Sequence, residues 1–421
     1  QYYSFVAELI SQGKQPFIDF FDHKPLVGPI TLLPFSWLST DIRVFLLAHT
    51  LLLSVISLLI FRFSSKIFQS NSIGVFVVFA FHAMTCLHQP SNGQLNAYLT
   101  NLEILWSLLF LLYANSFVGK KLPGAKGAFY LGILSSLCFQ TRFHPILILI
   151  IVALPILSYR KKNLQKANLL KSISFYSFSF IGFILTIISI FITFQVDPLA
   201  AYNSLIKFNA FYTNATYENL PTYVVLFKTF KIHFFPPLLF VVLPSLLGAF
   251  LLDRFNKKTL KFSLQSSSLF SLLLTSLFPI CSLLLLQTKH IKSYVLYLFI
   301  LFFLLILIHF IKNLFNFKYA AILLGLLCWY TAIEQLDQNH YKYELFFKWP
   351  EKELLEILDT NNSSDTILLF PASHLLMGAR KNPQTHSFYF RTWPIEILLG
   401  KEGVSRAVSY THLRAHETCL D

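Results

Sequence analysis

The stretch ISFYSFSFIGFILTIISIFITF (residues 173–194) contains no aspartate, glutamate, lysine or arginine. It is long enough to cross a hydrocarbon core about 30 Å thick, which takes roughly 17 to 25 helical residues. In the whole chain of 421 residues, 55% are hydrophobic and 13% are charged, and the mean hydropathy is +0.59. A soluble domain carries about 25% charged residues. The sequence therefore predicts an all-α polytopic membrane protein.

Further apolar runs complete a predicted bundle of ten transmembrane helices. These runs are residues 42–61, 73–87, 102–117, 128–139, 146–157, 234–252, 269–286, 294–311 and 320–333. Lysine and arginine fall mainly in alternate loops, which predicts that those loops face the cytoplasm. The outer loops between spans hold only Arg142, Lys207, Lys228, Lys231, Lys289 and Lys292. This pattern explains the net charge of +14 as a topology signal and not as a nucleic-acid site.

This orientation divides the chain into four parts. Residues 1–40 form a first extracytoplasmic loop, residues 41–333 the transmembrane region, and residues 334–407 an extracytoplasmic C-terminal segment. In that segment we expect a short helix at 351–358 and a strand at 366–370. Residues 408–421 are left out of the fold because they resemble a translated sequencing adapter.

The first outer loop is expected to begin with a helix. Apolar residues recur at helical spacing from Tyr2 to Ile10, with polar residues between them, which suits a helix lying in the membrane interface. Gly13 is expected to end it. A second long outer loop, 197–233, is rich in tyrosine and asparagine and is also expected at the interface.

A polar cluster follows that helix. Asp19, Asp22, His23 and Lys24 lie within six residues of a largely apolar chain. Lys24 could bind a phosphate, Asp22 and His23 could ligate a divalent cation, and the carboxylates could act in acid–base chemistry. The alternative is a solvated loop in which Pro25 starts the next helix.

Other charged residues lie where the predicted topology disfavours them. Glu103 lies at the outer end of a span, either as a functional group or as a carboxylate that reaches back to the interface or caps the helix start. Arg142, in the turn between two short spans, could contact a lipid headgroup or an anionic substrate. Lys289, His290 and Lys292 form a basic cluster that suggests either a phosphate site or contact with anionic lipid.

Three histidines and four cysteines are interpreted as packing residues, the histidines with their hydrogen bonds satisfied. They lie in or beside apolar runs without the spacing of a metal site: His49, His82, His309, Cys86, Cys138, Cys281 and Cys328.

Several outer segments together resemble the GT-C superfamily of membrane glycosyltransferases. The likeness is to the branch of protein O-mannosyltransferases, aminoarabinose transferases and Rgt-like galacturonosyltransferases. The matching segments are 2–7 (YYSFVA), 13–16 (GKQP), 19–26 (DFFDHKPL), the region around Glu103, 140–145 (QTRFHP), 209–212 (NAFY), 289–294 (KHIKSY), 365–370 (DTILLF) and 378–383 (GARKNP). They occur in the family's order and on the same predicted side of the membrane.

The resemblance implies transfer of a sugar from a polyprenyl-phosphate carrier to a lipid, glycan or protein acceptor. It places the principal catalytic acid upstream of Gln1, with Asp19, Asp22 and Glu103 as further candidates. Lys24 would contact the carrier phosphate, helped by Arg142, Lys289, His290 and Lys292. Some relatives bind a divalent metal beside this lysine, which makes Asp22 and His23 candidate ligands. His23 stands where one such relative has a carboxylate, and this difference counts against a metal.

The implied setting is the bacterial inner membrane, with the site facing outward and membrane lipids as partners. The rival interpretation is a secondary transporter or a lipid-carrier flippase. Transporter sites lie near the bilayer midplane, often between repeats, whereas here the charged residues gather at one interface and the sequence shows no repeat.

Overall fold

The computed structural model describes residues 2–19, 24–38, 42–86, 98–117, 122–142, 151, 166–207, 235, 238–255, 297–312 and 315–331. Within these ranges the chain is mostly helical and has no strand. The prediction of an all-α fold is therefore confirmed for this part of the chain. The helix and strand expected at 351–358 and 366–370 lie outside the described residues.

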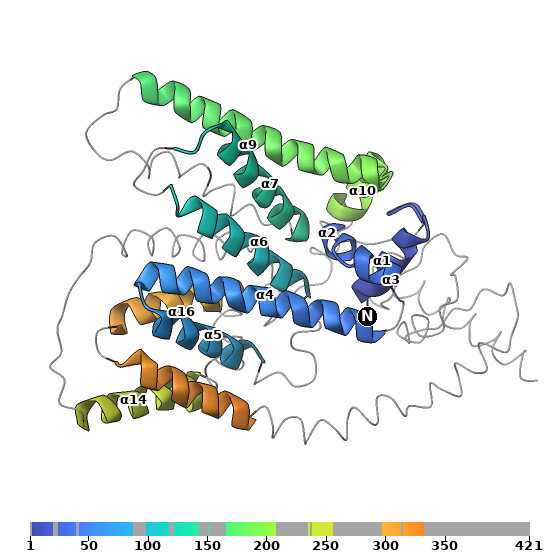
Figure 1. The fold of residues 1–421 in the computed structure, drawn as a ribbon. Coiled ribbons are helices and arrows are strands. Elements are labelled where there is room, and N and C mark those ends of the chain that lie inside the picture. The colour runs from blue at the N-terminus through green and yellow to red at the C-terminus, as the bar shows by residue number, and fades with distance from the viewer. Residues whose placement is uncertain are drawn as a thin grey trace, which may run out of the picture.

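The helices lie side by side in a bundle with short helices at one end (Figure 1). They are α1 (Tyr2–Ser11), α2 (Val27–Ile30), α3 (Leu33–Leu38), α4 (Ile42–Phe68), α5 (Asn71–Cys86), α6 (Tyr98–Ala114), α7 (Ala125–Arg142), α9 (Lys166–Thr193), α10 (Pro198–Tyr202), α14 (Leu243–Phe255) and α16 (Tyr297–Ile311). Two short π-helical segments, η1 (Asn203–Lys207) and η2 (Leu238–Val242), follow α10 and precede α14. One more helix covers residues 317–331.

Every predicted span has a helix, except 146–157 and 269–286, which lie outside the described residues apart from residue 151. The ends differ from prediction. The first span was expected to stop at residue 61, but α4 continues to Phe68. Arg62 and Lys66 end the apolar run without ending the helix, because both residue types favour helical backbone.

Two helices, α4 and α9, contain stretches long and apolar enough to cross a membrane: Leu47–Phe68 and Leu170–Thr193. Length and composition alone are weak evidence, because the core helix of a soluble protein meets the same criteria. Such a core helix is mostly buried, whereas only 39% of the apolar window of α4 and 17% of that of α9 is buried. Both helices therefore leave apolar surface uncovered.

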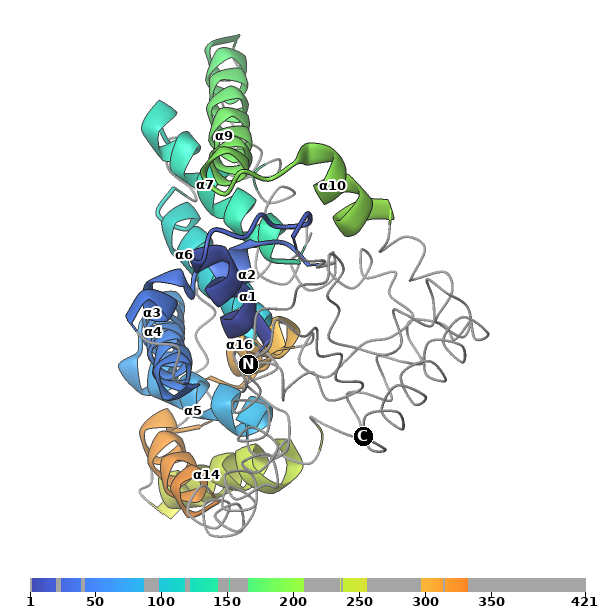
Figure 2. The ribbon, with the colours of Figure 1, turned by 90° about the vertical axis from the view of Figure 1, so that its right-hand side faces the viewer.

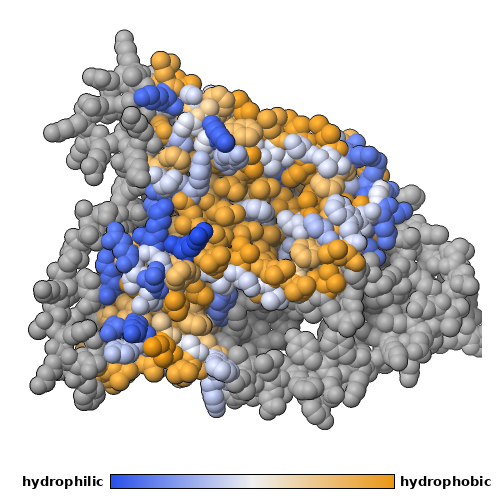
Figure 3. Space-filling view, in the orientation of Figure 1, coloured by the Kyte–Doolittle hydropathy of each residue, from blue (hydrophilic) through white to orange (hydrophobic). Residues whose placement is uncertain are grey.

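The exposed apolar side chains of α4 follow one stripe of the helix. They recur every three or four residues, as one helical face requires: Leu47, Leu51, Val55 and Leu58. The opposite side packs into the main core through Ile56, Ile60 and Phe63, each at most 2% exposed. On the molecular face shown in Figure 3, apolar residues dominate the middle and hydrophilic residues gather toward the left and right margins.

One end of the bundle is closed by α1, α2, α3 and α10. Figure 2 looks onto this end and places the four short helices in front of the bundle. They share a second apolar core with the starts of α4 and α6 and with the turn after α9, through Phe45, Tyr98 and Val196 among others. The sequence predicts that these three helix ends face the same side, and the shared core confirms it.

The pair α7 and α9 packs at short range through small residues. A Cβ added to Gly132 would collide with the Ser179 carbonyl oxygen, and one added to Gly182 would collide with the Phe129 carbonyl oxygen. The Ser179 hydroxyl also donates to the Ala128 carbonyl oxygen over 3.1 Å. Backbone contact of this kind holds helices together where no larger side chain fits.

Candidate functional site

The candidate site lies beneath the short helices at the closed end of the bundle. The helical pattern predicted from Tyr2 onward is confirmed as α1, whose Val6, Leu9 and Ile10 are buried against the second core. Gly13 follows with a φ of 81°, a left-handed conformation that glycine adopts without strain. The chain can therefore turn out of α1 at Gly13, as predicted, and return toward α2.

Lys24 lies just before α2, next to α1. Its Nζ atom donates a hydrogen bond to the Tyr3 hydroxyl over 3.0 Å, and it is 5.1 Å from the centre of the Tyr3 ring. Because the nitrogen is much nearer the hydroxyl oxygen than the ring centre, the contact is a hydrogen bond at the ring edge and not a cation–π interaction. Lys24 is half-buried, so its ammonium is held inside the loop.

A second hydrogen-bonded pair joins α2 to α6. The Thr31 hydroxyl lies 2.7 Å from the Gly28 carbonyl oxygen and 2.9 Å from the Tyr98 hydroxyl. Thr31 has one hydroxyl proton, which goes to Gly28, so Tyr98 is the donor to Thr31. Burial raises the pKa of Tyr98, which precedes the predicted span 102–117, to about 12, and the bond to Thr31 lowers it less. Tyr98 therefore keeps the proton that this role requires at neutral pH.

His49 and Asn101 lie beneath Tyr98. The Asn101 side-chain nitrogen is 3.0 Å from His49 Nε2, and the His49 ring meets the Tyr98 ring edge-on at 5.4 Å. An amide nitrogen can only donate, so Nε2 of His49 accepts and this imidazole is neutral. Both side chains are buried. The prediction that His49 is a packing residue with its hydrogen bond satisfied is confirmed.

The other two histidines interpreted as packing residues, His82 and His309, differ in their hydrogen bonding. His82 Nε2 pairs with the Ser57 hydroxyl at 2.7 Å, as expected of a satisfied packing residue. His309 is also buried, but its Nδ1 atom has no hydrogen-bond partner within the described residues. The expectation of a satisfied side chain is therefore wrong for this atom.

Glu103 lies in the interior and not at a surface. It is 1% exposed, and helical periodicity puts Thr100 and Ser107 on the same face of α6. The Ser107 hydroxyl is 3.6 Å from the Cys138 sulfur on α7. A carboxylate that reached back to the interface would be exposed, so that alternative for Glu103 is wrong. The helix α6 instead buries a carboxylate, and Ser107 on the same face reaches Cys138 of α7.

Asp19 holds a local turn. Its carboxylate accepts a hydrogen bond from the Gln15 backbone N–H over 2.7 Å, and its own N–H donates to the Gln15 carbonyl oxygen over 2.9 Å. The side chain is exposed. Within the turn Phe17 has a φ of 67°, which is costly for an aromatic residue and shows how tightly the loop bends. This arrangement favours a structural role for Asp19 over a catalytic one.

The remaining predicted site residues cannot be placed at this site. Arg142 is the last residue of α7, and nothing is described of its side chain. The other predictions lie outside the described residues: Asp22, His23, Lys289, His290 and Lys292. Among the described residues, no group of three or more histidines, cysteines, aspartates or glutamates is arranged to hold a metal ion.

Sequence reasoning missed the hydrogen-bonding roles of Tyr3, which contacts Lys24, and of Thr31, Tyr98 and Asn101. These residues come from α1, the end of α2 and α6, and the chain has 19 tyrosines, so no local pattern singles them out. The one available signal was polar residues within apolar helices, such as Asn101 in α6, which have to find partners when buried.

The comparisons with known proteins are negative. No family model, no curated protein and no solved structure matches the chain. The site therefore rests on its own geometry: a half-buried lysine that donates to the Tyr3 hydroxyl, in the segment between α1 and α2.

Proposed function

We propose that this protein is a polytopic membrane glycosyltransferase of the bacterial inner membrane. It transfers a sugar from a polyprenyl-phosphate carrier to a lipid, glycan or protein acceptor at the outer face. The site is the closed end of the bundle, where α1, α2 and α3 cover the starts of α4 and α6.

The uncovered apolar surface supports a membrane location. The α4 stripe from Leu47 to Leu58 and most of α9 are exposed, although they are as apolar as a protein core. Soluble proteins rarely leave contiguous apolar surface of this kind uncovered. In a bilayer the acyl chains cover it, and the hydrophilic margins seen in Figure 3 then lie at the two interfaces.

The place of Lys24 is the observation that supports transfer from a phosphate carrier. A cation on the outer side of such a protein is unusual, since positive charge concentrates on the cytoplasmic side. Lys24 is in addition held in place by the Tyr3 hydroxyl. A fixed ammonium stabilises negative charge that develops on a leaving phosphate.

The chemistry is a single inverting displacement. The acceptor hydroxyl oxygen forms a bond to the anomeric carbon as the bond from that carbon to the carrier phosphate oxygen breaks. A carboxylate takes the hydroxyl proton, and the electron pair of the broken bond leaves on the phosphate, beside Lys24. The family resemblance places the principal base upstream of Gln1; among the described residues Asp19, which holds the turn at Gln15, and the buried Glu103 are the further candidates.

A transfer assay on membranes that contain the protein tests this function. Labelled polyprenyl-phosphate sugars are supplied with membrane acceptors, and wild type is compared with Lys24→Ala and Lys14→Ala. Lys14 is an exposed lysine of the same loop and serves as the matched control. We expect Lys24→Ala to lower the rate about 100-fold, the usual effect of removing one transition-state donor, while Lys14→Ala keeps wild-type activity.

Lys24→Ala activity within about threefold of wild type, under about 1 kcal/mol on the barrier, would exclude a direct role for Lys24. Absence of transfer by wild type with every donor, together with carrier movement across proteoliposomes, would favour the flippase instead.

A further inference from the structure

Tyr3 is held from two sides by separate elements. Its ring lies 6.0 Å from the Tyr98 ring of α6, with the two planes tilted by 36°. On the side of α2, a Cβ added to Gly28 would lie 3.6 Å from Tyr3 Cδ1. This is an ordinary van der Waals distance, so α2 borders the Tyr3 ring on one side and Tyr98 borders it on another.

The ring in turn fixes where its hydroxyl can lie. That hydroxyl accepts the 3.0 Å hydrogen bond from Lys24. Lysine carries its charge on a long, flexible stem with three rotatable donors, so the backbone of Lys24 alone does not determine where the ammonium lies. The hydrogen bond to the Tyr3 oxygen restricts where the ammonium can lie.

The helix α2 is itself anchored to α6. Gly28 rests on the Leu99 side chain, and Thr31 accepts the hydrogen bond of the Tyr98 hydroxyl. Tyr98 thus contacts the Tyr3 ring and also holds the element that follows Lys24. A shift of α6 relative to the first loop would move the ring, and with it the ammonium.

We propose that Tyr3 is the positioning residue for Lys24, and that it fixes the ammonium for a phosphate-type anion by accepting its hydrogen bond. This inference rests on the proposed function for the identity of the anion. The alternative is that Tyr3 only fills space between α2 and α6. The two differ in what removal of the hydroxyl alone would do, because the ring contacts survive in phenylalanine.

The first test measures the reactivity of Lys24 without any assay of transfer. Membranes with wild type, Tyr3→Phe or the control Tyr202→Phe are reductively methylated for short times, and peptide mass spectrometry gives the rate at Lys24 relative to Lys14. Tyr202 is an exposed tyrosine of α10. We expect Tyr3→Phe to raise the Lys24 rate about threefold to tenfold, as loss of one hydrogen bond implies. An unchanged ratio would overturn the proposal.

Folding is monitored in the same samples by the reactivity of the buried Cys138 thiol. Should Tyr3→Phe expose Cys138, Tyr3→Trp replaces it, because indole keeps an aromatic ring but cannot accept a hydrogen bond. The expected rise at Lys24 is the same.

The second test uses transfer. We expect Tyr3→Phe to slow wild type about threefold to tenfold and to leave the residual rate of Lys24→Ala unchanged, because its effect passes through Lys24. An equal loss in both backgrounds would overturn the positioning role. If wild type transfers no sugar, the proposed function fails, whereas the Lys24 labelling rates still decide the position of the ammonium.

Discussion

Thr31 shows how single residues tie the first loop to the bundle. It closes α2, gives its proton to the Gly28 carbonyl oxygen and accepts one from Tyr98 of α6. The sequence singles out charged residues such as Lys24 and Glu103 as candidate site residues, because a charged side chain in an apolar chain is costly to bury. Thr31 and Tyr3 could not, since their roles come from contacts between distant parts of the chain.

We expect Thr31→Val and Tyr98→Phe each to destabilise the protein by about 1 kcal/mol, the usual net value of a hydrogen bond. Thr31→Ser keeps the hydroxyl and should therefore lose less stability than Thr31→Val. The double variant should lose less than the sum of the two single losses, because both remove the same bond. Thermal unfolding in detergent micelles measures this, and strictly additive losses would show that Thr31 and Tyr98 do not interact.

At the scale of the elements, helices were predictable and their ends were not. Apolar runs located α4, α5, α6, α7, α9, α14, α16 and the 317–331 helix, but α4 ends at Phe68 instead of residue 61 and α9 begins at Lys166 instead of residue 173. The positions where the helices end depend on helix propensity, as with Arg62 and Lys66 in α4. Hydropathy does not measure that propensity. The pairing of α7 with α9 was not predicted either, since it depends on glycines that face each other across two helices.

The α7–α9 contact predicts a large difference between two glycines near the same helix. In Gly132→Ala the new methyl group meets the Ser179 carbonyl oxygen, and the backbone has to move. In Gly124→Ala, just before α7, nothing lies within 4 Å of the new atom. We expect Gly132→Ala to lower the free energy of unfolding by about 1–3 kcal/mol, the usual cost of overpacking. Gly124→Ala should lower it by less than about 0.5 kcal/mol.

Unfolding temperatures of the two glycine variants in the same detergent measure this difference. Equal stabilities would mean that α7 and α9 are not in backbone contact.

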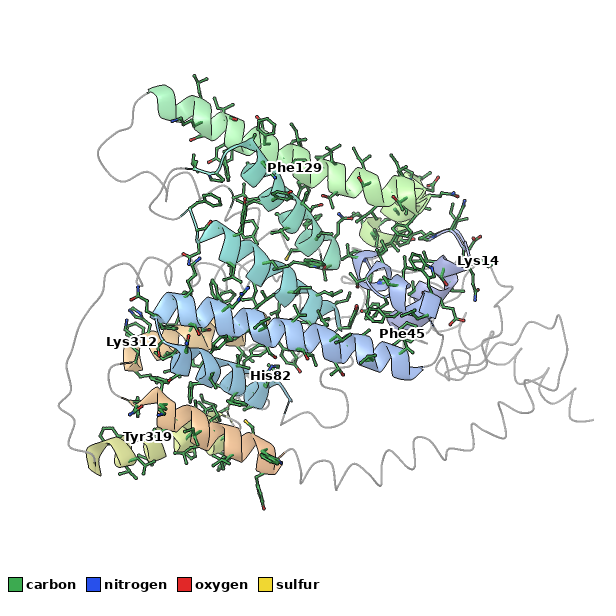
Figure 4. All side chains as sticks on the ribbon, in the orientation of Figure 1. Lys14, Phe45, His82, Phe129, Lys312 and Tyr319 are labelled. Atoms are coloured by element: carbon green, nitrogen blue, oxygen red, sulfur yellow. The ribbon has the colours of Figure 1, made fainter. Side chains whose placement is uncertain are left out.

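At the scale of the whole molecule, the two ends of the helix bundle carry different sets of residues. Figure 4 places Lys14 and Phe45 at one end and Lys312 and Tyr319 at the other. The first end carries the covered site with Lys24, and the second carries lysines predicted to face the cytoplasm. The sequence could predict this polarity because loop charge alternates along the chain. The cover over the site could not be predicted, because it is built from tertiary contacts.

The central claim is that the Lys24 end faces outward across a membrane. Single cysteines at Lys14, Lys126 and Lys318, which are all exposed, are introduced after the five cysteines of the sequence are replaced by alanine. Intact cells are then treated with a membrane-impermeant thiol reagent, and permeabilised cells serve as the control. We expect labelling of the cysteine at position 14 in intact cells, and labelling at 126 and 318 only after permeabilisation. Labelling of 126 and 318 but not of 14 in intact cells would contradict the claim, and so would equal labelling of all three.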